Sequence, residues 1–102
     1  MVPLPSYLTP SSITKGQTVD VAISGKNFKF NASPLFESPI TVIETRWFSD
    51  RVIFAKILIP ESASSGYYDV YVKNPDGKSG KLENGLLVTN DTPPIVSFGF
   101  PE

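Results

Sequence analysis

The stretch that decides the fold of this chain is Gly66-Tyr67-Tyr68-Asp69-Val70-Tyr71-Val72-Lys73-Asn74-Pro75-Asp76-Gly77. Its side chains alternate with a period of two, which places Tyr68 and the two valines on one face of a β-strand. The alternation stops at Asn74, where the sequence Asn-Pro-Asp-Gly favours a tight turn. We therefore expect two antiparallel strands joined by a turn in which Gly77 has a positive φ.

Similar alternation marks the rest of the chain as a series of short strands. The ten prolines are about twice the average usage. We expect them outside the strand interiors, because a missing N–H breaks a hydrogen-bonded ladder. No segment has the pattern of an amphipathic helix, so the sequence predicts an all-β sandwich of two antiparallel sheets. Further strands are expected around Tyr7-Leu8 and over Thr18 to Gly25, Ile40 to Arg46, Arg51 to Ile59 and Leu82 to Thr89.

The parity of these runs also predicts the core. Side chains that share one parity within a run lie on one face of its strand, and the apolar face packs inward. The residues predicted to be buried between the two sheets are Val21, Ile23, Ile57, Tyr68, Val70 and Val72, with Leu86 and Val88 inward on the last strand.

Several short sequence elements follow one another along the chain in a defined order and spacing. They are Pro10, Gly16, Thr18 to Phe28, Ser49 to Ile53, Ile59-Pro60, Gly66 to Val72 and Asn74 to Gly77. This succession resembles an IPT/TIG domain, a family found in plexins, Rel-type transcription factors, some starch-active enzymes and bacterial surface proteins. The resemblance implies an immunoglobulin-like fold, with Phe28 capping the core. It implies no single activity, because members of the family bind different things or only hold other domains apart.

Two segments depart from the family pattern. The first is a long insertion over Lys29 to Pro39. The second is Arg46-Trp47-Phe48, where inward and outward alternation cannot be kept through both Glu44 and Phe48, so we expect a β-bulge there.

The length of 102 residues is typical of one domain. We assign residues 1–89 to the sandwich and residues 90–102 to a Pro-rich segment that is a linker or the first strand of a following module. Ile95, Val96, Phe98 and Phe100 are costly to leave in water, so we expect this segment to be ordered. We also expect that the chain is a piece of a longer polypeptide to which Met1 was added.

Composition argues against an enzyme and against several kinds of ligand. The chain has no His and no Cys, so triads and common transition-metal sites cannot be built from it. No run of oxygen ligands suggests a calcium site, and we expect no cofactor. Its nine basic residues are scattered and its net charge is −1, which disfavours nucleic acid and anionic membranes. The carboxylates that remain for glycoside hydrolysis are Glu37, Glu44, Glu61, Asp69 and Asp76, and no motif marks any of them.

Outward aromatic residues suggest a possible sugar-binding platform. Tyr67 and Tyr71 should project from the outer face of their strand, and Trp47 lies at the end of a strand that we expect to pair nearby. Aromatic rings of this kind stack against sugars. The alternative is that the tyrosines are simply good strand formers that shield the sheet.

A set of apolar residues lies on the unexpected face of one strand. If Ile53 and the residues of its parity point inward, then Val52, Phe54 and Leu58 point outward, interrupted only by Lys56. A contiguous apolar patch of this kind often marks a contact surface. The alternative is that these side chains pack over Ala22 or under the Lys29 to Pro39 segment as a satellite cluster.

These features favour a non-catalytic spacer or protein-interaction module of a larger extracellular or cell-surface protein. Its partners would be the neighbouring domains of that protein or another protein. The alternative is an accessory carbohydrate-binding module of a secreted glycan-active enzyme.

Overall fold

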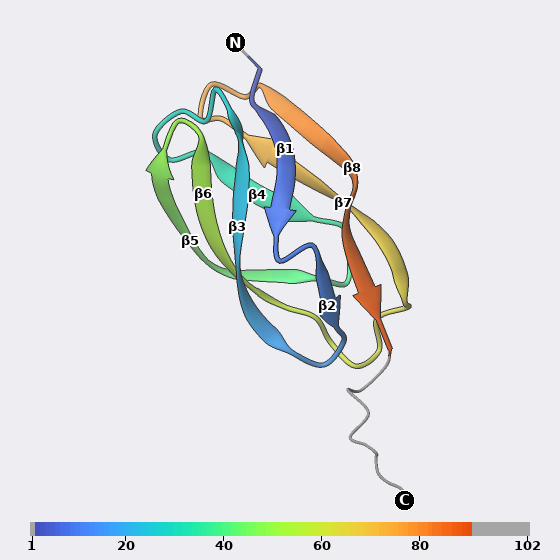
Figure 1. Ribbon diagram of the computed structural model, residues 1–102. Coiled ribbons are helices and arrows are strands. Elements are labelled where there is room, and N and C mark those ends of the chain that lie inside the picture. The colour runs from blue at the N-terminus through green and yellow to red at the C-terminus, as the bar shows by residue number, and fades with distance from the viewer. Residues whose placement is uncertain (1, 91–102) are drawn as a thin grey trace, which may run out of the picture.

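The computed structural model describes residues 2–90, and within that range the chain is entirely β-structure and loops. The strands pair into two four-stranded sheets (Figure 1). We call β1-β3-β6-β5 sheet A and β2-β8-β7-β4 sheet B. The strands are β1 Leu4–Thr9, β2 Ser12–Thr14, β3 Thr18–Lys26, β4 Ser33–Phe36, β5 Thr41–Ser49, β6 Val52–Leu58, β7 Gly66–Lys73 and β8 Ser79–Thr89.

The order of the strands is that of an immunoglobulin-like sandwich. In immunoglobulin lettering sheet A reads A-B-E-D, and sheet B reads G-F-C with the short β2 added beside G. All pairings are antiparallel except that of β2 with β8, which is parallel. The chain crosses from sheet A to sheet B between β1 and β2 without reversing its direction (Figure 1). β2 therefore runs in the same direction as β8, beside which it lies. The predicted fold class is confirmed.

The core lies between the sheets where the parity of the strands placed it. All six side chains predicted to be buried are at most 8% exposed, and Leu86 and Val88 are fully buried beside them. Phe28 is also fully buried, in the position expected for a residue that caps the core. The turn between β7 and β8 is confirmed as well: Gly77 has a φ of 93° and donates its N–H to the Asn74 carbonyl at 2.9 Å.

The β7–β8 turn is tied to the far end of β3 by Asn74, whose importance the sequence reasoning missed. Its side chain is 1% exposed. The carboxamide oxygen accepts the Lys29 N–H at 3.0 Å, and the carboxamide nitrogen donates to the Asn27 carbonyl at 3.0 Å. Asn74 therefore substitutes for a backbone partner in the loop that follows β3, which has left-handed backbone at Asn27.

The segment from Lys29 to Pro39 is more than a loop. It contains β4, which pairs antiparallel with β7 and places Pro34 opposite Val72. Pro5 likewise lies inside β1. The expectation that every proline lies outside a strand was therefore wrong at these two positions. Both strands are at the edges of their sheets, where one side of the strand needs no N–H donor.

β5 contains two irregularities, one of which was expected. The register with β6 shifts between Val42 and Glu44 and again between Trp47 and Ser49. The second shift confirms the bulge expected around Arg46-Trp47-Phe48. At the first shift, Ile43 is an extra residue that reverses the parity of the strand. Thr41 faces away from the core before it, and the even-numbered Glu44 and Arg46 face away from the core after it.

None of residues 2–90 lies in a helix, so the described part of the chain has no helix that could cross a membrane. The expectation of order for the C-terminal segment falls on residues that lie outside the described range.

Candidate functional site

The outer face of sheet A carries the apolar residues that the sequence singled out. Along β6 the side chains of Ile53, Ala55 and Ile57 are buried, while Phe54 is 39% exposed and Leu58 is 37% exposed. Val52 is half-buried on the same side. We call this surface the β3–β6–β5 face. Its outward residues are Thr18, Asp20, Ala22 and Ser24 on β3, Val52, Phe54, Lys56 and Leu58 on β6, and Thr41, Glu44, Arg46 and Ser49 on β5.

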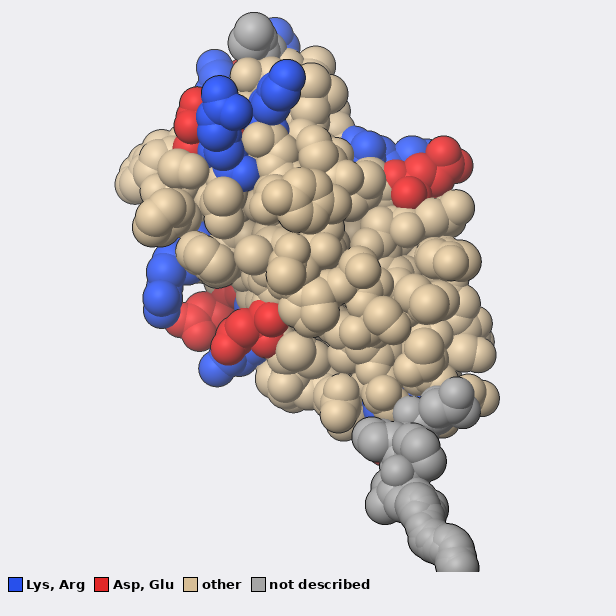
Figure 2. Space-filling view, viewed as in Figure 1, with Lys and Arg blue, Asp and Glu red and all other residues tan. Residues whose placement is uncertain are grey.

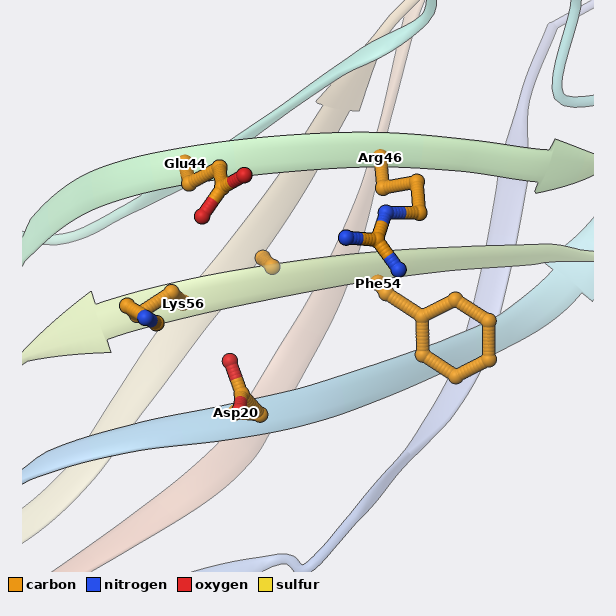
Figure 3. Close-up of a pocket in the computed structure, with 6 residues that line it drawn as sticks. Asp20, Glu44, Arg46, Phe54 and Lys56 are labelled. Carbon is orange, nitrogen blue, oxygen red and sulfur yellow. The ribbon is translucent and has the colours of Figure 1, made fainter.

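The Lys29 to Pro39 segment does not cover this face, because its strand β4 belongs to sheet B. That explanation for the outward apolar residues was therefore wrong. Phe54 does lie opposite Ala22 in the register of β3 and β6, and its ring leans toward β3 (Figure 3). The small Ala22 side chain still leaves the ring open to solvent.

Phe48 extends the apolar surface at the edge of the sheet. It is the extra residue at the second bulge of β5 and is 66% exposed. Its ring meets that of Phe54 edge to face, with 5.8 Å between the centroids and 73° between the planes. The sequence reasoning missed Phe48 as a surface residue. The broken alternation between Glu44 and Phe48 was the signal that could have found it, since a bulge re-aims a side chain.

A shallow hollow of about 320 Å³ lies in the middle of this face (Figure 3). Four charged side chains surround it, and Phe54 forms one wall. Among the described residues the ion pairs join Lys29 to Asp76 and Lys81 to Asp69, so none involves the charges of the hollow. Those four charges balance to zero and are free to meet a partner. The lining residues are Asp20, Glu44, Arg46, Phe54, Ala55 and Lys56.

The three aromatic residues suggested for sugar stacking are not brought together. Tyr67 and Tyr71 project from β7 in sheet B, where Tyr67 is 63% exposed. Trp47 lies on β5 in sheet A and packs against the core. Its indole N–H donates to the Phe28 carbonyl at 2.9 Å, and its ring meets that of Phe30 at 5.4 Å. The expectation that its strand pairs near the tyrosines was wrong, because β5 and β7 belong to different sheets.

Glu37 and Asp69 each accept a backbone N–H. Glu37 accepts the Asp69 N–H at 2.7 Å. Asp69 in turn accepts the Asn84 N–H at 2.8 Å and lies 3.9 Å from the Lys81 ammonium. Asn84 has a φ of 55° and lies where β8 bulges opposite Asp69, so this carboxylate supports the irregular backbone.

The other carboxylates are dispersed. Asp76 lies in the β7–β8 turn, where the Lys78 N–H and the Lys29 ammonium lower the pKa of its carboxyl below its usual value. Glu44 is on the β3–β6–β5 face, and Glu61 is exposed in the loop before β7. Residues 2–90 contain no group of three or more acidic, His or Cys residues placed to hold a metal ion.

Charges are unevenly placed on the view of the molecule in Figure 2. Lys, Arg, Asp and Glu side chains lie toward its margins, and a broad area over β1 carries neither sign (Figure 2). The sequence has the same asymmetry, since its first charged side chain is Lys15. Several Lys and Arg side chains gather at the top of this view, with acidic side chains beside them (Figure 2).

Comparison with known proteins adds no assignment. No model of a known protein family matches the chain, and no curated protein matches it.

Proposed function

We propose that this chain is a non-catalytic module of the IPT/TIG type that serves as a spacer or protein-interaction domain in a larger extracellular or cell-surface protein. The observation that carries the proposal is the exposure of Phe54 on the outer face of sheet A, with the ring of Phe48 beside it at the edge of the sheet. The extracellular setting and the IPT/TIG assignment rest on the resemblance in sequence, which agrees with the immunoglobulin-like strand order.

The exposed phenylalanines are not needed to complete the core. β6 already contributes Ile53, Ala55 and Ile57 to the interior, each at most 2% exposed. Phe54 and Phe48 leave apolar surface in water, which costs about 25 cal/mol for each Å² that a partner would cover. Aromatic residues and Arg are also the side chains most enriched in the centres of protein interfaces, and Arg46 lies directly opposite Phe54. A protein contact therefore explains residues that the fold alone does not require.

Photocrosslinking tests this proposal. A benzoylphenylalanine in place of Phe54 should crosslink to protein when the chain is expressed in its native host, and mass spectrometry should locate the partner. The same photoreactive residue in place of Tyr67, on the opposite sheet, is the matched control and should yield far less protein adduct.

Equal labelling from the two positions would contradict the proposal. Stronger labelling from position 67 would make Tyr67 and Tyr71 the better candidates, because their outer face on sheet B also includes Leu35 and Leu87 as cross-strand neighbours. Glycan-array binding that is lost in Tyr67→Ala would instead support the alternative, an accessory carbohydrate-binding module of a secreted glycan-active enzyme.

A further inference from the structure

We propose that the β3–β6–β5 face binds a second copy of this chain, face to face, in a dimer with twofold symmetry. This inference rests on the proposed function, since it names the protein partner of the same surface. It is carried by the arrangement of charges and apolar side chains on that face, which is complementary to itself in one orientation.

The outward side chains of three neighbouring strands form four rows across the sheet. Each row takes one residue from β3, one from β6 and one from β5, in register. The second row alternates in charge, and the third combines an aromatic ring with a cation. The rows are Thr18–Leu58–Thr41, Asp20–Lys56–Glu44, Ala22–Phe54–Arg46 and Ser24–Val52–Ser49.

A twofold axis in the plane of the interface can run across the strands, between the second and third rows. It then places each strand over the same strand of the other copy, running in the opposite direction. Glu44 meets Arg46 of the second copy, and Lys56 meets the ring of Phe54. Each contact occurs twice, because a twofold interface repeats every pair.

These pairs are individually favourable. Glu44 with Arg46 is a charge-assisted pair, and neither side chain forms an ion pair with another residue of the range 2–90. An ammonium over an aromatic face is attracted by the negative charge density of the ring. The outer rows add an apolar contact of Leu58 with Val52. Asp20 lies over the small Ala22 and keeps Lys56 as its neighbour in the row.

The other in-plane axis, along β6, is unfavourable. It would place Asp20 over Glu44 of the second copy, which occurs twice, and Lys56 over Lys56 of the second copy, which occurs once. Three like-charge contacts would therefore form. Like charges that face each other in an interface weaken association. Electrostatics therefore select the axis across the strands.

The geometry of sheets permits this dimer. Two twisted sheets that pack face to face cross at about 30°, so the rows nearest the axis stay aligned while the outer rows diverge. The charged and aromatic pairs belong to the two central rows, where alignment is best. Phe48 lies beside Phe54 at the rim and lengthens the apolar contact.

Sedimentation velocity with charge reversal tests the dimer. The wild-type chain should dimerise within a range of about 10 μM to about 1 mM, which covers transient associations. Glu44→Arg and Arg46→Glu should each weaken dimerisation by about tenfold or more, because each creates two like-charge contacts. The double variant Glu44→Arg/Arg46→Glu restores opposite charges and should recover the wild-type dimer. Glu83→Arg, an equal charge change on exposed β8, should have no effect.

The outcomes separate this inference from the proposed function. A wild-type chain that stays monomeric throughout the range overturns the dimer, as does a dimer unaffected by the single reversals or not restored by the double variant. If position 54 still crosslinks to a different protein, the contact surface stands and only the partner is wrong. If sedimentation shows no dimer and position 54 labels no protein, both proposals fail. Matching unfolding curves for all variants ensure that each result reports on association.

Discussion

At the scale of single residues, the buried Asn74 side chain holds two backbone groups of a distant loop. It is the buried polar residue among the large, fully buried side chains of the described range. Its carboxamide satisfies one donor and one acceptor in the loop after β3, and its backbone closes the turn before β8. A buried polar group is stable only when it is paired, and removing one partner leaves the other without compensation.

Replacing Asn74 with Ala should therefore destabilise the domain. We expect a loss of about 1 to 3 kcal/mol in the free energy of unfolding, because two backbone groups lose their partner while water reaches them only in part. Urea denaturation measures the change. Lys78→Ala is the control, since this side chain is exposed in the same turn, and it should change stability little. Equal losses for both variants would contradict the role assigned to the Asn74 carboxamide.

At the scale of elements, irregular positions decide what each strand presents. In β5 the extra residue Ile43 reverses the parity, so Glu44 and Arg46 point outward and Trp47 packs against the core. The extra residue Phe48 then projects beside Phe54. The β7–β8 hairpin depends in the same way on one residue, because Gly77 takes the left-handed backbone that closes the turn.

The geometry of the hairpin predicts that different substitutions at Gly77 lower the stability of the domain by different amounts. Its φ is 93°, and a Cβ placed there would meet nothing within 4 Å, so a substitution costs backbone strain rather than a steric clash. Gly77→Val should lower stability by about 1 to 2 kcal/mol, since β-branched residues rarely adopt this region. Gly77→Asn should cost less, because Asn tolerates it. Thermal unfolding of the two variants gives the order, and a Val variant as stable as the Asn variant would refute the argument.

At the scale of the whole molecule, the two faces of β6 lie in different surroundings, one in the core and one toward solvent. Ile53 is fully buried between the sheets, whereas its neighbour Phe54 faces solvent on the β3–β6–β5 face. The fold therefore buries one parity of β6 in the core and leaves the other facing solvent.

Substitution of adjacent residues should expose this division. Ile53→Ser should lower the free energy of unfolding by about 3 to 5 kcal/mol, because it opens a cavity and buries a hydroxyl. Phe54→Ser should cost only about 1 kcal/mol, since much of its ring is already exposed. Both are measured by denaturation at low protein concentration, where association contributes nothing. A larger loss at Phe54 than at Ile53 would mean that the two faces are assigned the wrong way round.

The sequence by itself determined the strands of regular alternation, the side chains they bury and the turn at Gly77. These features depend on the period of two of an extended chain and on the local preferences of Asn, Pro and Gly, so they can be read from neighbours in sequence. The outward set on β6 was visible for the same reason.

Only the tertiary structure decided which strands are neighbours. It placed Trp47 and Tyr71 in different sheets, formed β4 within the Lys29 to Pro39 insertion, and made Asn74 a bridge to the end of β3. It also brought Asp20, Lys56 and Glu44 into one row. These relations arise from hydrogen bonds between residues far apart in sequence, and a bulge of one residue reverses every side chain after it. Local periodicity carries no record of either, which is why the charged residues around the outward set on β6 became visible as its neighbours only in the assembled sheet.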